Sequence, residues 1–203
     1  MLCDEGHVAH GISCDVSHAP DVQGLVDGTM ARFGSVDILV CNAGITGTAG
    51  SWSLDDFDRV MAINLRSIVA LTTLALPHMA ARGGGSAILM SSLSAMRGNG
   101  AINAYALAKA GVAQLARNLA VQWGPQNVRV NALAPGLIQT PLSAPLMADE
   151  EFMARRMQMT PLRRVGNVTD VANACLFLAS PASSFITGQQ IAVDGGTSIT
   201  DGS

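Results

Sequence analysis

The most constraining feature of this chain is a regular alternation between short apolar segments and longer segments with helical periodicity. Apolar runs of strand length occur at residues 8–14, 36–41, 86–90, 128–133 and 190–193. Helical patterns occupy residues 21–33, 54–82, 103–123 and 170–178, and Ser53 and Thr169-Asp170 are the predicted N-terminal caps of the second and fourth. Alternating strands and helices are typical of a parallel sheet with right-handed connections. The sequence therefore predicts an α/β fold, and 203 residues suggest a single domain over residues 1–203.

The composition excludes several classes of protein. Apolar residues make up 49% of the chain and charged residues 13%, which indicates a globular protein. The net charge of −3, without a basic block, argues against binding to nucleic acid or to anionic membranes. The longest apolar run, residues 68–77, is too short to span a bilayer. The cysteines and histidines lack metal-ligand spacing, so we expect no metal site and a reducing, cytoplasmic location.

A tyrosine and a lysine stand four residues apart in the third helical segment. Tyr105 is the only tyrosine of the chain, and Lys109 is its only lysine. Residues i and i+4 share one face of a helix, so the phenol and the ammonium are expected on the same side. A nearby cation favours the phenolate, so we expect Lys109 to lower the pKa of Tyr105 and to suit it for proton transfer. The alternative interpretation is an ordinary exposed pair on a surface helix.

Other polar residues follow the predicted strands. Ser92 comes directly after the strand at residues 86–90, and the turn Asn42-Ala43-Gly44 follows the strand at residues 36–41. Asn64 is a polar residue inside an apolar helical pattern. In open α/β sheets, ligands bind beyond the carboxyl ends of the strands. We therefore expect these residues to gather around one ligand site.

Together these motifs resemble the classical short-chain dehydrogenase/reductase family, and the resemblance extends from about residue 7 to residue 196. It implies a Rossmann-like, doubly wound parallel sheet. It also implies that Tyr105 is the catalytic acid/base, that Lys109 lowers its pKa and holds the nicotinamide ribose, and that Ser92 binds the substrate carbonyl. Asn64 would hold a water that links Lys109 to solvent. The implied partner is a small alcohol or ketone substrate, and the implied activity is hydride transfer between a secondary alcohol and a ketone.

The resemblance also implies a site for NAD or NADP. The positions that match the family's cofactor-binding segments are Asp15, Val16, Asn42, Ala43, Gly44, Tyr105, Lys109, Pro135, Gly136, Ile138 and Thr140. Cys41 stands where the family motif has its first asparagine. The closing segment Val193-Asp194-Gly195-Gly196 matches the family's last strand and turn.

The family's glycine-rich T-G-x-x-x-G-x-G turn has no match in this sequence. We therefore expect an N-terminally truncated fold that lacks the first strand, the glycine-rich turn, the first helix and the second strand. The residue that distinguishes NAD from NADP lies in that missing part, so the choice stays open. Residues 8–14 would then either pair directly with residues 36–41 or leave that edge of the sheet open.

Two helical segments, residues 61–79 and 101–119, are apolar on nearly every face. Because a sheet protein of this size leaves one of those faces uncovered, we expect a homo-oligomer, and the resemblance implies a tetramer. A thicker monomer core is the alternative.

Residues 142–160 are rich in methionine and match the family's mobile substrate lid, or else form an ordinary amphipathic helix. Within them Arg155 and Arg156 are expected in solvent.

Three functions remain open at this point. The first is the NAD(P)-dependent oxidoreductase described above. The second is a catalytically impaired, truncated homologue that acts only as an oligomerising or binding module. The third is an epimerase or dehydratase of the same family, in which Tyr105 remains the acid/base.

Overall fold

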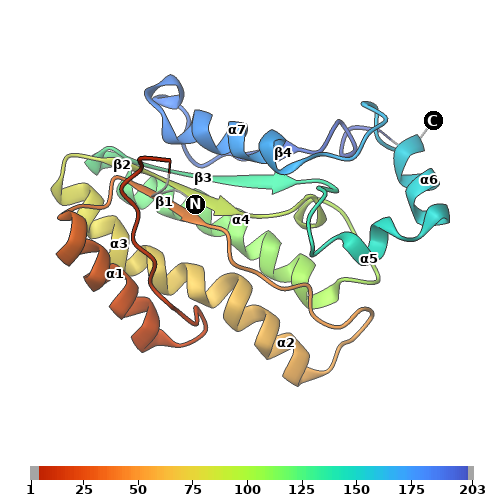
Figure 1. Ribbon diagram of the computed structural model, residues 1–203, viewed down its shortest axis with the longest axis horizontal. Helices are drawn as coiled ribbons and strands as arrows, with labels where there is room; N and C mark the ends of the chain where they lie inside the picture. The colour runs from red at the N-terminus through yellow and green to blue at the C-terminus, as the bar shows by residue number, and fades with distance from the viewer. Residues whose placement is uncertain (1–4, 201–203) are drawn as a thin grey trace.

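The computed structural model describes residues 5–200 and contains a four-stranded parallel sheet (Figure 1). The strands are β1 (Ile38–Cys41), β2 (Gly85–Met90), β3 (Val128–Pro135) and β4 (Gln190–Val193), in the spatial order β1-β2-β3-β4. Each strand pairs in parallel with the next, with Cys41 opposite Leu89 and Met90 opposite Leu133. The carboxyl ends of all four strands therefore lie along one edge of the sheet.

Helices cover one face of this sheet more completely than the other (Figure 1). The fuller face carries α3 (Ser67–Ala81) and α4 (Asn103–Trp123), and α1 (Ala19–Phe33) packs on α3. The opposite face carries α7 (Val168–Ala179). The shorter elements are α2 (Leu54–Met61), α5 (Ala144–Met147), α6 (Glu150–Gln158), a π-helical turn η1 (Ala62–Arg66) and the 3₁₀ turns η2 (Leu93–Ala95), η3 (Gly124–Gln126) and η4 (Pro181–Ser183).

The side chains of β2 alternate between two hydrophobic cores. Ala87 and Leu89 are fully buried and pack in the core formed with α3 and α4. Ile88, between them, packs instead with Leu133 and with Leu178 of α7. A strand that is apolar on both faces is typical of the centre of a parallel sheet, and this explains why residues 86–90 form an unbroken apolar run.

The connection from β3 to β4 departs from the predicted handedness. The strand order continues in one direction from β1 to β4, yet α3 and α4 cover one face while α7 covers the other (Figure 1). The β3-to-β4 connection therefore has the opposite hand to the two connections before it. Since right-handed connections are the strong general rule, the prediction of uniform handedness was wrong for this segment. The intervening α5 and α6 make this connection the longest of the three.

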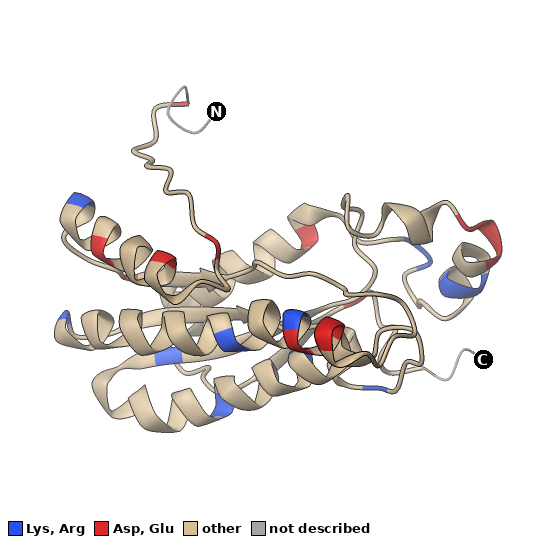
Figure 2. Ribbon diagram, turned by 90° about the horizontal axis from the view of Figure 1, so that it is seen from below, with Lys and Arg blue, Asp and Glu red and all other residues tan. Residues whose placement is uncertain are grey.

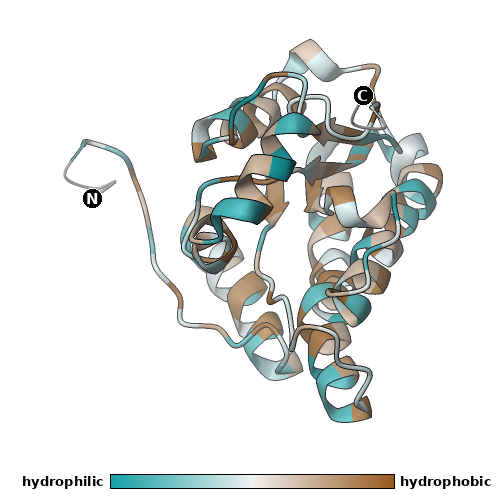
Figure 3. Ribbon diagram, turned by 90° about the vertical axis from the view of Figure 1, so that its right-hand side faces the viewer, coloured by the Kyte–Doolittle hydropathy of each residue, from teal (hydrophilic) through white to brown (hydrophobic). Residues whose placement is uncertain are grey.

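Residues 8–14 do not form the predicted strand. The segment is extended and lies outside the sheet, Val8 is 75% exposed, and residues 5–14 project away from the rest of the protein (Figures 2 and 3). Ile12, Cys14 and Val16 are partly covered while their neighbours are exposed, so the alternation that suggested a strand reflects contact on one side only. A strand needs a neighbouring strand, and none of the four described strands pairs with residues 8–14. The edge of β1 accordingly stays open, with Ile38 52% and Val40 43% exposed.

The helical segment after Ser53 is continuous from α2 through η1 to α3. Ser53 accepts a hydrogen bond from the Asp56 backbone N–H at 3.2 Å, which confirms the predicted cap. By length and composition, Leu54–Ala81 is apolar enough to cross a membrane. Here Ile68, Leu76 and Met79 of this segment pack against the sheet, which is the position of a core helix.

The cap of α7 differs from the predicted one. The N-cap is Asn167, whose side chain accepts from the Asp170 backbone N–H at 3.0 Å, while the Asp170 carboxylate accepts from the Asn167 backbone N–H at 2.8 Å. This reciprocal capping box places Thr169 inside the first turn and not at the cap.

We expect Asn167→Ala to lower the free energy of unfolding by about 1 kcal/mol, because an orphan backbone N–H at the helix start loses its acceptor. Urea unfolding monitored by circular dichroism measures this change. The matched control is Thr169→Ala, two residues away, for which we expect a much smaller loss. Equal losses in the two variants would contradict the assignment of the cap.

Candidate active site

The carboxyl ends of β1, β2 and β3 bring the predicted site residues to one edge of the sheet. Asn42-Ala43-Gly44 follows β1, Ser92 follows β2, and Gly136 follows β3. Ser92 is 8% exposed and begins η2, where its hydroxyl accepts a hydrogen bond from the Ser94 backbone N–H at 3.1 Å. The first turns of α4 pack beside this edge and carry Tyr105 and Lys109.

Tyr105 and Lys109 lie on the same side of α4, as the spacing predicts. Lys109 is only 3% exposed, and its Nζ donates a hydrogen bond to the Met90 carbonyl at 2.7 Å. The same Nζ lies 5.6 Å from the centroid of the Tyr105 ring. The lysine is therefore a buried cation held between the end of β2 and the phenol, and the interpretation as an exposed surface pair is excluded.

The predicted direction of the Tyr105 pKa shift was wrong. Burial raises the pKa of Tyr105, and a hydrogen bond with Ser92 only partly offsets this effect. Burial also lowers the pKa of Lys109 to about 8. The expectation considered only the attraction between opposite charges, whereas the removal of both groups from water disfavours the charged form of each. Both side chains are consequently mainly protonated at neutral pH.

Ser91, which the sequence analysis did not single out, ties α4 to the sheet. Its hydroxyl donates to the backbone carbonyl of Lys109 at 2.8 Å and accepts from the Gln190 side chain of β4 at 3.2 Å. The sequence shows only two adjacent serines after a strand. Which serine faces the helix backbone and which faces Tyr105 depends on the pleat of β2.

Asn64 lies in the π-helical turn between α2 and α3 and is fully buried. Its Oδ1 accepts from the Ile45 backbone N–H at 2.9 Å, and its Nδ2 donates to the Ile45 carbonyl at 2.7 Å. A Cβ on Gly44 would lie 3.1 Å from the Asn64 Oδ1 and 3.5 Å from the Lys109 Nζ. The structure thus brings Asn64 and Lys109 together around a glycine, and the close packing accounts for the small residue in the turn.

The predicted cofactor-binding positions around β1 fall into two groups. Val16, Asn42 and Ala43 line one small cavity of about 140 Å³ between β1, α1 and α3. Asp15 is exposed, and its carboxylate accepts from the Ser17 backbone and hydroxyl at 2.9 and 2.7 Å. These bonds lower the pKa of Asp15, so the side chain is already engaged in the turn that precedes α1.

The positions after β3 are held against β4. The Gly136 backbone N–H donates to the Val193 carbonyl at 3.0 Å, and a Cβ on Gly136 would lie 2.8 Å from the Asp194 Cβ. The Thr140 backbone N–H donates to the Ser143 hydroxyl at 3.1 Å. Pro135 ends β3. Glycine is thus required at Gly136 because the turns that follow β3 and β4 touch there.

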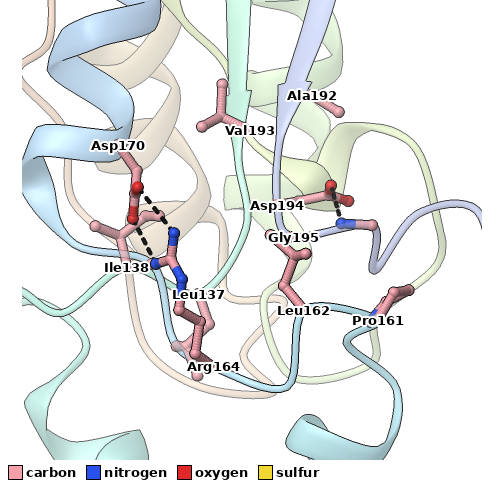
Figure 4. Close-up of a pocket in the computed structure, with 12 residues that line it drawn as sticks. Leu137, Ile138, Pro161, Leu162, Arg164, Asp170, Ala192, Val193, Asp194 and Gly195 are labelled. Carbon is pink, nitrogen blue, oxygen red and sulfur yellow. Dashed lines mark hydrogen bonds and ion pairs between the residues drawn. The ribbon is translucent and has the colours of Figure 1, made fainter.

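A second cavity, of about 480 Å³, lies beyond this segment (Figure 4), and Tyr105 is not among its lining residues. Of the predicted site residues, its lining includes only Ile138. Figure 4 shows Arg164 facing Asp170 across this cavity, with both carboxylate oxygens engaged at 2.7 and 3.0 Å. That ion pair lowers the pKa of Asp170 to about 2 and fixes α7 to the segment before it. Within residues 5–200, no cluster of three or more His, Cys, Asp or Glu side chains has the geometry to hold a metal ion.

Comparisons with known proteins cover almost the whole chain. A family model described as Enoyl-(Acyl carrier protein) reductase matches residues 2–198. The short-chain type dehydrogenase/reductase y4mP of Sinorhizobium fredii, itself uncharacterized, is 40% identical over 195 residues, which are 94% of this chain and 77% of that protein.

Two solved structures superpose closely. A gluconate 5-dehydrogenase from Burkholderia cenocepacia, in complex with NADP and tartrate, has a TM-score of 0.93 at 34% identity, covering 98% of this chain and 78% of that one. A 7α-hydroxysteroid dehydrogenase, complexed with NADH and 7-oxo glycochenodeoxycholic acid, has a TM-score of 0.91 at 37% identity, covering 96% and 76%. The predicted Rossmann-like parallel sheet is confirmed. Because the match in sequence runs through all four strands and the fold agrees with enzymes of known structure, the chain belongs to the short-chain dehydrogenase/reductase family.

Proposed function

We propose that this protein is an NAD(P)-dependent oxidoreductase that interconverts a secondary alcohol and a ketone. The observation that carries the proposal is the pairing of the partly buried Tyr105 with the buried Lys109, with Ser92 hydrogen-bonded to the phenol, at the carboxyl edge of the sheet. The two solved relatives hold NADP and NADH, and one of them also holds a 7-oxo compound. An epimerase or dehydratase would use the same tyrosine, but no feature of the site favours either reaction.

Tyr105 is the group that gives a proton to the substrate oxygen in reduction and takes it back in oxidation. Its raised pKa keeps the phenol protonated at neutral pH, which suits it as the acid. Ser92 contacts the phenol and directs the substrate oxygen toward it. When bound, a nicotinamide dinucleotide supplies or accepts the hydride at the carbon that bears this oxygen.

In this proposal, Lys109 and Asn64 take part in the reprotonation of Tyr105. With a pKa of about 8, Lys109 exchanges its proton readily near neutral pH. An amide oxygen can accept two hydrogen bonds and an amide nitrogen can donate two, so the bonds of Asn64 to Ile45 leave one position on each atom. We propose that a water molecule occupies one of these free hydrogen-bonding positions of Asn64 and connects Lys109 to solvent. Lys109 also serves to hold the nicotinamide ribose.

The residues present fit part of a dinucleotide site. Val16, Asn42 and Ala43 line a cavity at the adenine side. Within the described chain, no glycine-rich turn joins a strand to a helix start, which is the usual pyrophosphate site. We propose that a pyrophosphate-binding strand–turn–helix element belongs against the open edge of β1, where Ile38 and Val40 are exposed. Such an element would raise dinucleotide affinity without altering the Tyr105 site.

We expect Tyr105→Phe to reduce kcat/KM for alcohol oxidation by roughly 10²- to 10⁴-fold, because the proton-transfer group is lost while the ring and Lys109 remain. NADH and NADPH binding, measured by nicotinamide fluorescence, is expected to stay within a few-fold of the unaltered chain. Retention of most of the activity would rule out the assigned role of Tyr105. Absence of dinucleotide binding in both proteins would instead count against the proposed use of NAD(P).

Lys109 gives a separate, pH-dependent test. Its pKa is lowered in the folded chain to about 8 from 10.5, so above pH 8 the unfolded chain retains a proton that the folded chain has lost. The contribution of Lys109 to the free energy of unfolding therefore rises with pH, by about 1 kcal/mol between pH 8 and pH 9. Urea unfolding at the two pH values, with Lys109→Met as the reference, isolates this rise. A difference between the two proteins that does not change with pH would contradict it.

We also propose that the chain assembles into a homo-oligomer, a tetramer by analogy with its family, through α3 and α4. Val69 is 42% exposed, and Leu107 and Val121, four helical turns apart on α4, are 50% and 81% exposed. We expect Val121→Glu to shift the mass measured by light scattering at micromolar concentration toward the monomer, because a charge would enter an apolar contact. Val168→Glu, on α7, serves as the control for an exposed apolar residue elsewhere. A monomer in the unaltered chain would remove the proposal.

A further inference from the structure

Two arginines from different segments meet at the carboxyl edge of the sheet. Arg97 follows Ser92 by five residues, in the loop after η2, and is partly buried although Met96 and Gly98 beside it are exposed. Arg156 lies in the last turn of α6 and is also partly buried. The two guanidinium groups are close enough to repel each other, and Asp194, after β4, is close enough to attract Arg156. The segments that follow β2, β3 and β4 thus each contribute one charged residue to this cluster.

The guanidinium of Arg156 is incompletely satisfied. Its Nε is fully buried and has no hydrogen-bond partner among the described residues. Buried donors are normally paired, because an unpaired one has lost its bonds to water without replacement. The ion pairs within the described chain are His18–Asp21, Arg59–Asp56 and Arg164–Asp170, and neither Arg97 nor Arg156 takes part in them. The Nε–H of Arg156 is therefore available to donate a hydrogen bond to a ligand in a partly enclosed position.

Asp194 does not supply the missing partner. Its Oδ1 accepts from the Gly196 backbone N–H at 3.0 Å, and its Oδ2 accepts from the Ser198 backbone N–H at 2.7 Å. The carboxylate is thus committed to the turn after β4, where Figure 4 shows its bond to the turn backbone. Two cations and one anion leave the cluster with a net charge of +1.

The segment that carries Arg156 is fixed in place. The Thr160 hydroxyl donates to the Arg156 carbonyl at 2.8 Å and lies 3.0 Å from the Thr197 hydroxyl. Glu150 and Glu151 lie in the first turn of α6, whereas Arg155 and Arg156 lie in its last turn. Arg155, the neighbour of Arg156, is exposed. The expectation that both arginines are solvated holds for Arg155 and was wrong for Arg156, because only one of two successive helical residues faces the sheet edge.

We propose that Arg97 and Arg156 bind a carboxylate of the substrate, so that the alcohols and ketones handled at Tyr105 are hydroxy acids and oxo acids. A guanidinium offers a planar set of donors that matches a carboxylate, and two of them can hold both of its oxygens. The carboxylate at Arg97 and the reacting oxygen at Ser92 would belong to one molecule, because the two residues are five positions apart in one loop. This inference depends on the proposed function for the reaction of the bound molecule. The binding of its carboxylate does not depend on the proposed function.

Matched pairs of acids and amides test the proposal. The probes are 4-oxocyclohexanecarboxylate and 4-oxopentanoate, each compared with its carboxamide, as substrates with NADH and NADPH. We expect the unaltered protein to favour the acid of at least one pair by roughly 10- to 100-fold in kcat/KM, because charge-assisted hydrogen bonds are lost in the amide. The preference is expected to appear mainly in KM.

The variants are Arg97→Gln and Arg156→Gln, with Arg155→Gln as the matched control on the same helix. We expect both site variants to lose the preference for the acid while their kcat/KM for the amide changes little, and the control to keep it. Arg156→Lys is expected to recover part of the preference through its charge. Equal losses for acid and amide would indicate a structural role for the arginines and would overturn the proposal, as would a preference that survives in both site variants.

Calorimetric titration with the same acids and amides, with and without dinucleotide, separates the two proposals. Binding of the acids without turnover would count against the proposed oxidoreductase activity alone. Turnover of the amides and acids at equal rates, or absence of any binding preference for the acids, would reject the carboxylate site and leave the proposed activity intact.

Discussion

The hydrogen bond from the Lys109 ammonium to the Met90 carbonyl, 2.7 Å long and closed to solvent, organises the site of this protein. It joins α4 to the carboxyl end of β2, where a parallel strand leaves a carbonyl without a partner in the sheet. The Ser91 hydroxyl strengthens the same junction by donating to the Lys109 backbone carbonyl. A buried ammonium is unfavourable unless its donors are satisfied, so the position of α4 along the sheet is restricted by the need to satisfy this one.

This junction determines the chemistry available to Tyr105. The phenol and the ammonium are both largely removed from water, and burial disfavours the charged form of each. The phenol is therefore protonated and lies beside a lysine with a pKa of about 8. This arrangement favours proton transfer and does not stabilise a phenolate. The Cys41 thiol, whose pKa burial raises to about 12, adds no charge to this environment near neutral pH. A bound dinucleotide would add its own dipoles and charges to the same pocket.

The other residues with a proposed function lie at the ends of the strands and at the edge of the sheet. The centre of the sheet, β2 and β3, is apolar on both faces and supplies the rigid support. The carboxyl ends of β2, β3 and β4 gather Ser92, Arg97, Arg156 and Asp194, while the open edge of β1 exposes Ile38 and Val40. The reversed hand of the last connection contributes to this distribution, because it carries α5 and α6 past the strand ends before α7 covers the second face.

The sequence by itself determined the elements whose evidence is local. The helix at residues 103–123 agrees with α4 at both ends, and the strand at residues 190–193 agrees with β4, because periodicity and propensity depend on neighbours in the chain. The i, i+4 spacing likewise fixed that Tyr105 and Lys109 share a face. The tertiary structure decided what depends on partners distant in sequence. It left residues 8–14 outside the sheet, because none of the described strands lies beside them. It also engaged Asn64 in hydrogen bonds with the Ile45 backbone, and left Arg156 partly buried while Arg155 is exposed. It also reversed the expected shift of the Tyr105 pKa, since desolvation depends on everything packed around a group and a sequence pattern records only what lies beside it along the chain.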